Sequence, residues 1–281
     1  MKLGDRWKIF MLMLFILAII PQTRLFAQST DQKVDQLLEK MTLEEKVGQM
    51  TQITIQAVSA QEGKVGQDHE IDPEKLREAI TEYHVGSLLN VWNKAYSAEH
   101  WQDIITQIQD IALNDTRLGI PLIYGIDAIH GANYTQNATL FPQSINMAAT
   151  WNPELVRLES EITAKELRYT GLPWNFNPVL GIGRHQAWSR FWETYGESEL
   201  AATVMGTEYV IGQQGDNPAA DDKVAACAKH FIGYSFPFTG KDRTPALIPE
   251  RMLREIFLPP FRKTIDAGAL TVMVNSSEIN G

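Results

Sequence analysis

Short apolar runs alternate with longer amphipathic segments along most of the chain. The apolar runs cover residues 85–91, 121–126, 174–180, 224–231 and 270–274. Runs of this length, bounded by polar and turn-forming residues, are typical of strands that are buried in a sheet. The pattern therefore predicts buried strands that are separated by helices.

Helix signals fill the intervals between these runs. Asn152–Pro153 supplies a capping residue followed by proline at the first helical position, and the apolar period after it predicts a helix that ends near Gly171. A second helix is expected over 197–212. A third is expected over 249–268, interrupted at Pro259–Pro260 because proline removes a backbone donor.

The repeating unit of strand and helix predicts an α/β fold whose parallel strands are covered by helices. Such a sheet is either a closed barrel or an open doubly wound sheet. No Gly-x-Gly-x-x-Gly motif follows the first predicted strand, which weakens the dinucleotide-binding version and favours a barrel. In a barrel, functional residues gather at the carboxyl ends of the strands.

Residues 1–27 have the pattern of a secretory signal peptide. Three basic residues precede the apolar run 9–20, and Ala27 offers a small residue at a cleavage point. The run is shorter than the roughly 20 apolar residues of a membrane-spanning helix, so a retained anchor is the weaker interpretation. We expect export to the periplasm or the extracellular space, with no membrane partner after cleavage.

The composition narrows the range of partners. The chain has 44% hydrophobic and 21% charged residues and a net charge of −9, which becomes −12 when the four basic and one acidic residues of 1–27 are removed. An acidic protein with no basic stripe is a poor partner for nucleic acid, and neutral substrates fit better. The single cysteine, Cys227, cannot form an internal disulfide and is expected to be buried.

Charged residues follow two of the predicted strands. Asp127 comes directly after the strand 121–126, where its carboxylate can accept hydrogen bonds from sugar hydroxyls; capping of the next helix is the alternative. Lys229 and His230 leave the end of the strand 224–231, where unpaired burial would be costly. They can donate to hydroxyls, and a structural ion pair is the alternative role for this segment.

Arginine and tryptophan are concentrated in the segment that follows the strand 174–180. Sugar rings present hydroxyl edges to charged groups and C–H faces to aromatic rings, so Arg190 with Trp188 or Trp192 could hold a sugar. Burial in the core is the alternative for either tryptophan.

Four segments in this order resemble glycoside hydrolase family 3, whose members include β-glucosidases and exo-acting β-glucanases. They are GIDAIHG at 125–131, NFNPVL at 175–180 with the following WSR and Glu193, ACAKHF at 226–231, and TVMVNSSEING at 271–281. The resemblance implies a (β/α)8 TIM-type barrel, incomplete at its C-terminus, over residues 28–281. It also implies that Asp127, Arg190, Lys229 and His230 hold the terminal sugar.

The resemblance further implies a retaining enzyme that releases terminal β-linked glucose from gluco-oligosaccharides and needs no metal or other cofactor. The family's nucleophile is an aspartate, usually in a Ser-Asp-Trp sequence, and the acid/base commonly lies in a second domain; no Ser-Asp-Trp occurs in this chain. We therefore expect the chain to bind sugar, to contain no catalytic carboxylate, and to need a C-terminal domain of the same protein. The alternatives are a non-catalytic carbohydrate-binding module and a barrel enzyme unrelated to sugars.

Overall fold

The computed structural model describes residues 29–60, 70–91 and 94–281. The chain divides by its internal contacts into Met1–Met41 and Thr42–Gly281. In the first unit, helix α2 (Thr30–Lys40) begins with a capping box formed by Ser29 and buries none of its residues. The predicted signal peptide lies outside the described residues. None of the helices in the described part of the chain is both long and apolar enough to cross a membrane.

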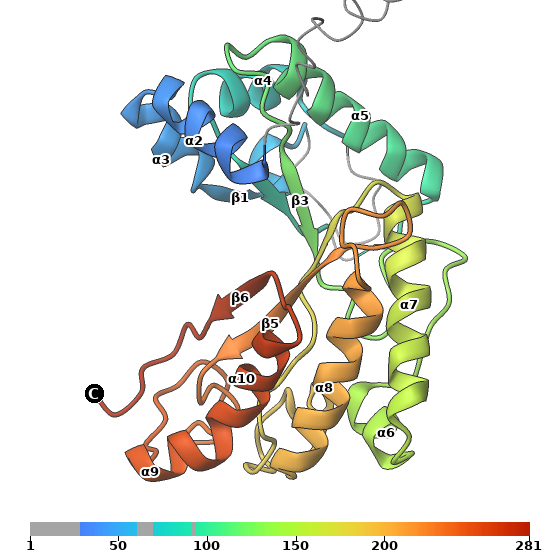
Figure 1. Ribbon diagram of the computed structural model, residues 1–281, viewed down its shortest axis with the longest axis vertical. Coiled ribbons are helices and arrows are strands. Elements are labelled where there is room, and N and C mark those ends of the chain that lie inside the picture. Colours follow the sequence, from blue (N-terminus) through green and yellow to red (C-terminus); the bar gives the residue numbers. More distant parts are fainter. Residues whose placement is uncertain (1–28, 61–69, 92–93) are drawn as a thin grey trace, which may run out of the picture. The chain divides into compact units, whose positions relative to one another are not determined.

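The second unit is built on one parallel sheet. Its strands are β1 (Gln52–Thr54), β2 (Ser87–Leu89), β3 (Ile123–Ile126), β4 (Trp174–Asn175), β5 (Ala225–Phe231) and β6 (Thr271–Val274). Figure 1 shows β1, β3, β5 and β6 of this sheet. Each strand pairs in parallel with the next one along the chain, so the order in the sheet is the order in the sequence, β1 to β6. This is the order of an incomplete (β/α) barrel, and the predicted fold class is confirmed.

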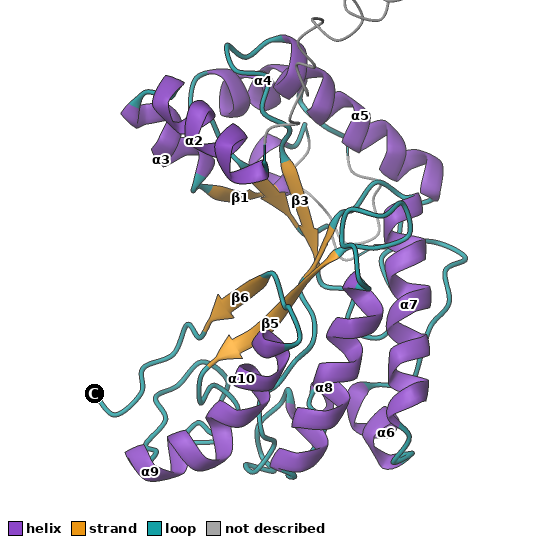
Figure 2. Ribbon diagram, in the orientation of Figure 1, coloured by secondary structure: helices purple, strands orange, loops and turns teal. Residues whose placement is uncertain are grey.

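Helices alternate with the strands and lie along the outer side of the strand layer (Figure 2). They are α3 (Leu43–Gln49), α4 (Pro73–Thr81), α5 (Ala98–Asn114), α6 (Ser144–Ala149), α7 (Pro153–Tyr169), α8 (Glu199–Gln214), α9 (Glu250–Met252) and α10 (Leu258–Asp266), with the shorter turns η1 (Ile55–Val58), η2 (Phe191–Glu193) and η3 (Leu253–Phe257). Helices α7 and α8 pack against each other, and α8 also contacts α10 and β5. Two apolar clusters result, one around α4, α5 and β3 and one around α8, α10 and β5.

The predicted helix at 249–268 is not interrupted as expected. Helix α9, the π-helical segment η3 and α10 follow one another directly. Pro259 and Pro260 fall in the first turn of α10, where a missing N–H costs the helix least. The interruption predicted at the two prolines is therefore wrong, because the π-helical turn ahead of them changes the hydrogen-bond spacing.

The strand predicted at 174–180 is shorter than its apolar run. Strand β4 ends at Asn175, and a further bridge joins Val179 to Lys229 of β5. Pro178 lies between the two stretches and has no N–H to donate to a neighbouring strand. The pairing resumes directly afterwards, since the N–H of Leu180 donates to the carbonyl of Lys229 at 2.7 Å.

The buried side chain of Asn175 ties β4 to the segment that follows β3. Its amide oxygen accepts from the backbone N–H of Ala128 at 3.1 Å, and its amide nitrogen donates to the Ala128 carbonyl at 3.0 Å and to Gln213 at 3.1 Å. Asn175 has no exposed surface, so these partners cannot be replaced by bulk water. The residue next to Asp127 is thereby held by a side chain from the neighbouring strand.

Replacing Asn175 by alanine should lower the free energy of unfolding by about 3 kcal/mol, because two buried backbone groups of Ala128 lose their partners. Urea unfolding of the purified protein measures the loss. The matched control, Asn114→Ala at the exposed end of α5, should change the stability by less than about 0.5 kcal/mol. Equal losses in the two variants would contradict the role given to Asn175.

Candidate substrate-binding site

A buried ion pair joins the ends of β3 and β5. Nζ of Lys229 lies 2.5 Å from Oδ1 of Asp127, across 102 residues of sequence. Lys229 is 1% exposed, whereas the side chain of Asp127 is 35% exposed. A charge as deeply buried as that of Lys229 requires a partner of opposite sign, and Asp127 is that partner. The structural ion pair considered for Lys229 is therefore present, and Asp127 caps none of the helices in the described residues.

The backbone of Lys229 is held on one side by the segment that follows β4. Its N–H donates to the carbonyl of Pro178 at 3.0 Å, and its carbonyl accepts from the N–H of Leu180 at 2.7 Å. On its other side, Lys229 is in register with Met273 of β6. The backbone that carries the Lys229 ammonium group is thus held between the segment after β4 and strand β6.

A second ion pair lies in the turn η2. Arg190 donates from Nε to Oε1 of Glu193 at 2.7 Å and from Nη2 to Oε2 at 2.6 Å, which is a bidentate arrangement. Glu193 is 6% exposed, so both of its oxygens are used away from water. Burial opposes the charge on Arg190, but the hydrogen bonds and the charge of Glu193 raise its pKa above the ordinary value. Arg190 is therefore positively charged at physiological pH.

The two ion pairs line one pocket of about 300 Å³. Its lining residues are Asp127, Ile129, His130, Asn133, Tyr134, Arg190, Trp192, Glu193 and Lys229. Three of the four predicted site residues are thus brought together, and the two positive charges are balanced by the two carboxylates. A pocket with balanced charges and many hydrogen-bonding groups suits a neutral polar ligand.

Several pocket residues were not predicted as members of the site. Glu193 could have been found from its position three residues after Arg190, since side chains at this spacing meet in a helical turn. Nδ1 of His130 donates to the carbonyl of Phe141 at 3.2 Å, since a carbonyl oxygen can only accept, and no local pattern indicates this contact. Tyr134 lines the same pocket, and burial followed by the charges of Asp127 and Glu193 raises its pKa.

The fourth predicted residue, His230, does not line this pocket. Its ring lies against Tyr234, with 4.6 Å between the ring centres. Burial and the positive charges of Lys229, Arg190 and Arg243 lower the pKa of His230 to about 2. The imidazole is therefore neutral at physiological pH, and it can donate from one ring nitrogen and accept at the other.

The two tryptophans of the loop after β4 have different environments. Trp188 is 2% exposed, and its Nε1 donates to Oδ1 of Asp242 at 2.9 Å. Trp192 is 43% exposed and lines the pocket beside Arg190. Of the two tryptophans, Trp192 is therefore the one available to a ligand, and Trp188 is part of the packing.

Comparison with protein families identifies the region that contains the pocket. Residues 42–281 match the model of the glycosyl hydrolase family 3 N terminal domain. The chain is similar to a lysosomal beta glucosidase of Dictyostelium discoideum, at 43% identity over 91% of this chain and 32% of the relative. It is also similar to a periplasmic beta-glucosidase of Salmonella typhimurium, at 32% identity over 90% of this chain and 30% of the relative.

A solved structure has the same arrangement of elements. The beta-glucosidase of Listeria innocua in complex with glucose superposes with a TM-score of 0.75 at 29% identity, over 90% of this chain and 33% of that one. The chain spans about a third of the length of the curated relatives it matches. The residues compared are thus one part of those longer enzymes.

The replacement Asp127→Ala should lower the free energy of unfolding by about 3 to 5 kcal/mol, because it leaves the Lys229 charge buried without a partner. Adding Lys229→Met, which removes that charge, should restore most of the loss. Urea unfolding of both variants measures the difference.

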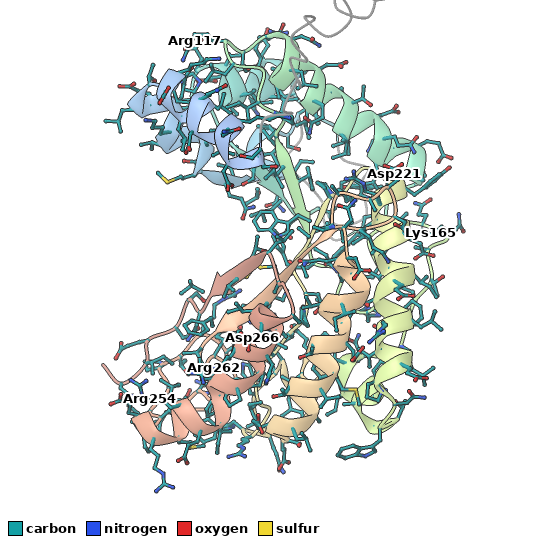
Figure 3. All side chains as sticks on the ribbon, in the orientation of Figure 1. Arg117, Lys165, Asp221, Arg254, Arg262 and Asp266 are labelled. Atoms are coloured by element: carbon teal, nitrogen blue, oxygen red, sulfur yellow. The ribbon has the colours of Figure 1, made fainter. Side chains whose placement is uncertain are left out.

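The control for this experiment is an exposed ion pair. Arg254 and Glu250 are 2.7 Å apart on the surface of the α9 to α10 run, where Arg254 extends outward (Figure 3). Glu250→Ala should cost less than about 1 kcal/mol. A double variant that is no more stable than Asp127→Ala would contradict the claim that an unpaired charge causes the loss.

The lowered pKa of His230 predicts that stability falls as the solution becomes acidic. Below pH 6.5 the unfolded chain takes up a proton at His230, whereas the folded chain does so only near pH 2. The free energy of unfolding therefore decreases from pH 6.5 downward, by at most about 1.4 kcal/mol per pH unit from this group. His230→Asn should flatten the pH dependence measured between pH 6.5 and 4. Parallel curves for the wild type and His230→Asn would count against the lowered pKa.

Proposed function

The chain belongs to glycosyl hydrolase family 3, and from this premise we propose that it holds the terminal sugar in an enzyme that hydrolyses terminal β-D-glucosidic bonds of gluco-oligosaccharides with retention. The observation that carries the proposal is the pocket in which the pairs Lys229–Asp127 and Arg190–Glu193 meet. Its ligand is a neutral β-linked sugar, and the proposal includes neither a metal nor another cofactor.

The hydrogen-bonding capacity of the pocket supports a sugar ligand. Asp127 uses one oxygen for Lys229 and is 35% exposed, so its second oxygen can accept from a hydroxyl group. Arg190 can donate to a hydroxyl oxygen from N–H groups that Glu193 does not use. Trp192 adds an exposed ring on which the C–H face of a pyranose can lie. His230 does not line the pocket, and in this proposal its neutral ring supports the site through its contact with Tyr234.

The two ion pairs also bear on which residues bind the sugar and which carry out the reaction. A retaining glycosidase needs two carboxyl groups about 5 to 5.5 Å apart, of which one attacks the anomeric carbon and one protonates the leaving oxygen. Both oxygens of Glu193 are held by Arg190, and Asp127 has one oxygen on Lys229 and the other assigned to a sugar hydroxyl, so we assign neither carboxylate to the attack. We propose that the nucleophile and the acid/base are supplied by other parts of the whole enzyme, including a C-terminal domain.

Export belongs to the same proposal. The N-terminal pattern of residues 1–27 is that of a signal peptide. Two relatives are a periplasmic and a lysosomal beta-glucosidase by name, which supports export. We propose that the protein acts in the periplasm or outside the cell, on oligosaccharides rather than on nucleic acid or membrane.

A non-catalytic carbohydrate-binding module is the second candidate function. The same pocket supports it, because binding of a sugar needs no catalytic carboxylate. The two candidates differ in what the whole gene product does with an aryl β-glucoside. An enzyme releases the phenol, whereas a module binds glucose in a calorimetric titration and releases nothing. No turnover by the product of the whole gene would therefore overturn the proposed function.

The product of the whole gene should hydrolyse aryl β-glucosides, and the 281-residue chain alone should not. In the whole product, Asp127→Ala should lower kcat/KM by about 100-fold or more, since it removes a charged hydrogen bond to the sugar and frees the Lys229 charge. Asp266→Ala, on the exposed surface of α10 (Figure 3), is the matched control and should leave kcat/KM unchanged. Turnover by the short chain at the rate of the whole product would contradict the division of roles.

A further inference from the structure

A line of hydrogen bonds behind the pocket joins the loop after β4 to the segment after β5. Oδ1 of Asp242 accepts from the hydroxyl of Tyr234 at 2.7 Å and from Nε1 of Trp188 at 2.9 Å. The hydroxyl of Tyr234 in turn accepts from Nη1 of Arg190 at 3.1 Å. Arg190 is thus connected to Asp242 through the Tyr234 hydroxyl, 44 residues further along the chain.

The direction of each hydrogen bond in this line follows from chemistry. An ionised carboxylate can only accept, and the hydroxyl of Tyr234 has a single hydrogen, which therefore goes to Asp242. Burial opposes ionisation of Asp242, but the hydrogen bonds from Tyr234 and Trp188 outweigh it and lower the pKa of Asp242. The lone pairs of the Tyr234 hydroxyl consequently remain for Arg190.

The line determines which donors of Arg190 are left for a ligand. A guanidinium group has five N–H donors in one plane. Glu193 takes one from Nε and one from Nη2, and Tyr234 takes one from Nη1. One N–H on each terminal nitrogen remains, at the outer edge of the plane. Three bonds from two side chains fix that plane, so the direction of the two remaining donors is fixed as well.

The members of this line are held rigidly. Trp188 and Tyr234 are 2% and 4% exposed, and their rings meet edge to face with 5.4 Å between the centres. The guanidinium carbon of Arg190 lies 5.3 Å from the centre of the Tyr234 ring, so the phenol supports the cation as well as bonding to it. Asp242 is the ionised end of the line and the only one of its members that carries a negative charge.

We propose that Tyr234 and Asp242 are positioning residues that aim the two remaining N–H donors of Arg190 at the bound sugar, with Trp188 holding Asp242 in place. The inference rests on the proposed function, because it assigns the sugar as the ligand of Arg190. It places part of the affinity for the sugar in the segment after β5, at residues that do not line the pocket.

The experiment uses the product of the whole gene with three variants. Tyr234→Phe removes the hydroxyl and keeps the ring, and it should raise KM for an aryl β-glucoside about 10-fold while kcat changes less than about 3-fold, because binding is lost equally in the ground and transition states. Asp242→Ala should have the same effect, and adding it to Tyr234→Phe should raise KM no further. Asp242→Asn, which keeps an acceptor oxygen, should recover most of the wild-type KM.

Tyr169→Phe is the matched control, since Tyr169 is 71% exposed on α7, and it should leave KM and kcat unchanged. The melting temperature of each variant separates loss of positioning from loss of folding. An unchanged KM in folded Tyr234→Phe would overturn the proposal. A fall in kcat as large as the rise in KM, or a lower melting temperature that accounts for the whole effect, would overturn it as well.

A second measurement separates this inference from the proposed function. The wild type and Tyr234→Phe are labelled with 5-fluorotryptophan, and the Trp188 signal is assigned by its loss in Trp188→Phe. If Tyr234 and Trp188 share Asp242, the Trp188 fluorine signal should move in Tyr234→Phe and stay in place in Tyr169→Phe. Absence of turnover in the wild type would refute the proposed function, and an unmoved Trp188 signal would refute the hydrogen-bonded line on its own.

Discussion

The buried ammonium group of Lys229 is the constraint on which the site depends. A positive charge at 1% exposure is stable only next to a negative one, and the structure provides Asp127 at 2.5 Å. The pair requires the end of β3 and the end of β5 to meet, although β4 lies between them in the sheet. The side chain of Asn175 in β4 holds Ala128, the residue after Asp127, and so helps to fix the segment that carries the carboxylate.

The second ion pair, Arg190–Glu193, likewise neutralises a buried charge, here in the loop after β4. Arg190 is held by Glu193 within one turn and by Tyr234 from the segment after β5. Each charged group in the pocket is therefore neutralised by the protein itself before any ligand arrives. Such a pocket binds by directed hydrogen bonds and not by net charge, which is the kind of recognition that neutral sugars require.

Part of this arrangement could be predicted from the sequence. The apolar runs fix the strands, and parallel strands bring their carboxyl ends to one edge, so Asp127 and Lys229 were expected to lie near each other. The concentration of arginine and tryptophan after the strand 174–180 indicated Arg190, and the family resemblance assigned it to the terminal sugar. The pairing of Tyr234 with Asp242 could not be predicted, because it joins positions in an irregular segment that has no period. The different environments of Trp188 and Trp192, and the position of His230 outside the pocket lining, depend on tertiary packing in the same way.

A crystal structure of the whole gene product with glucose tests the proposed sugar site most directly. We expect the sugar ring to occupy the 300 Å³ pocket, with hydroxyl oxygens within about 3.2 Å of the Asp127 carboxylate and of the outer N–H groups of Arg190. Glucose bound elsewhere, with only water in contact with Asp127 and Arg190, would contradict the proposed site.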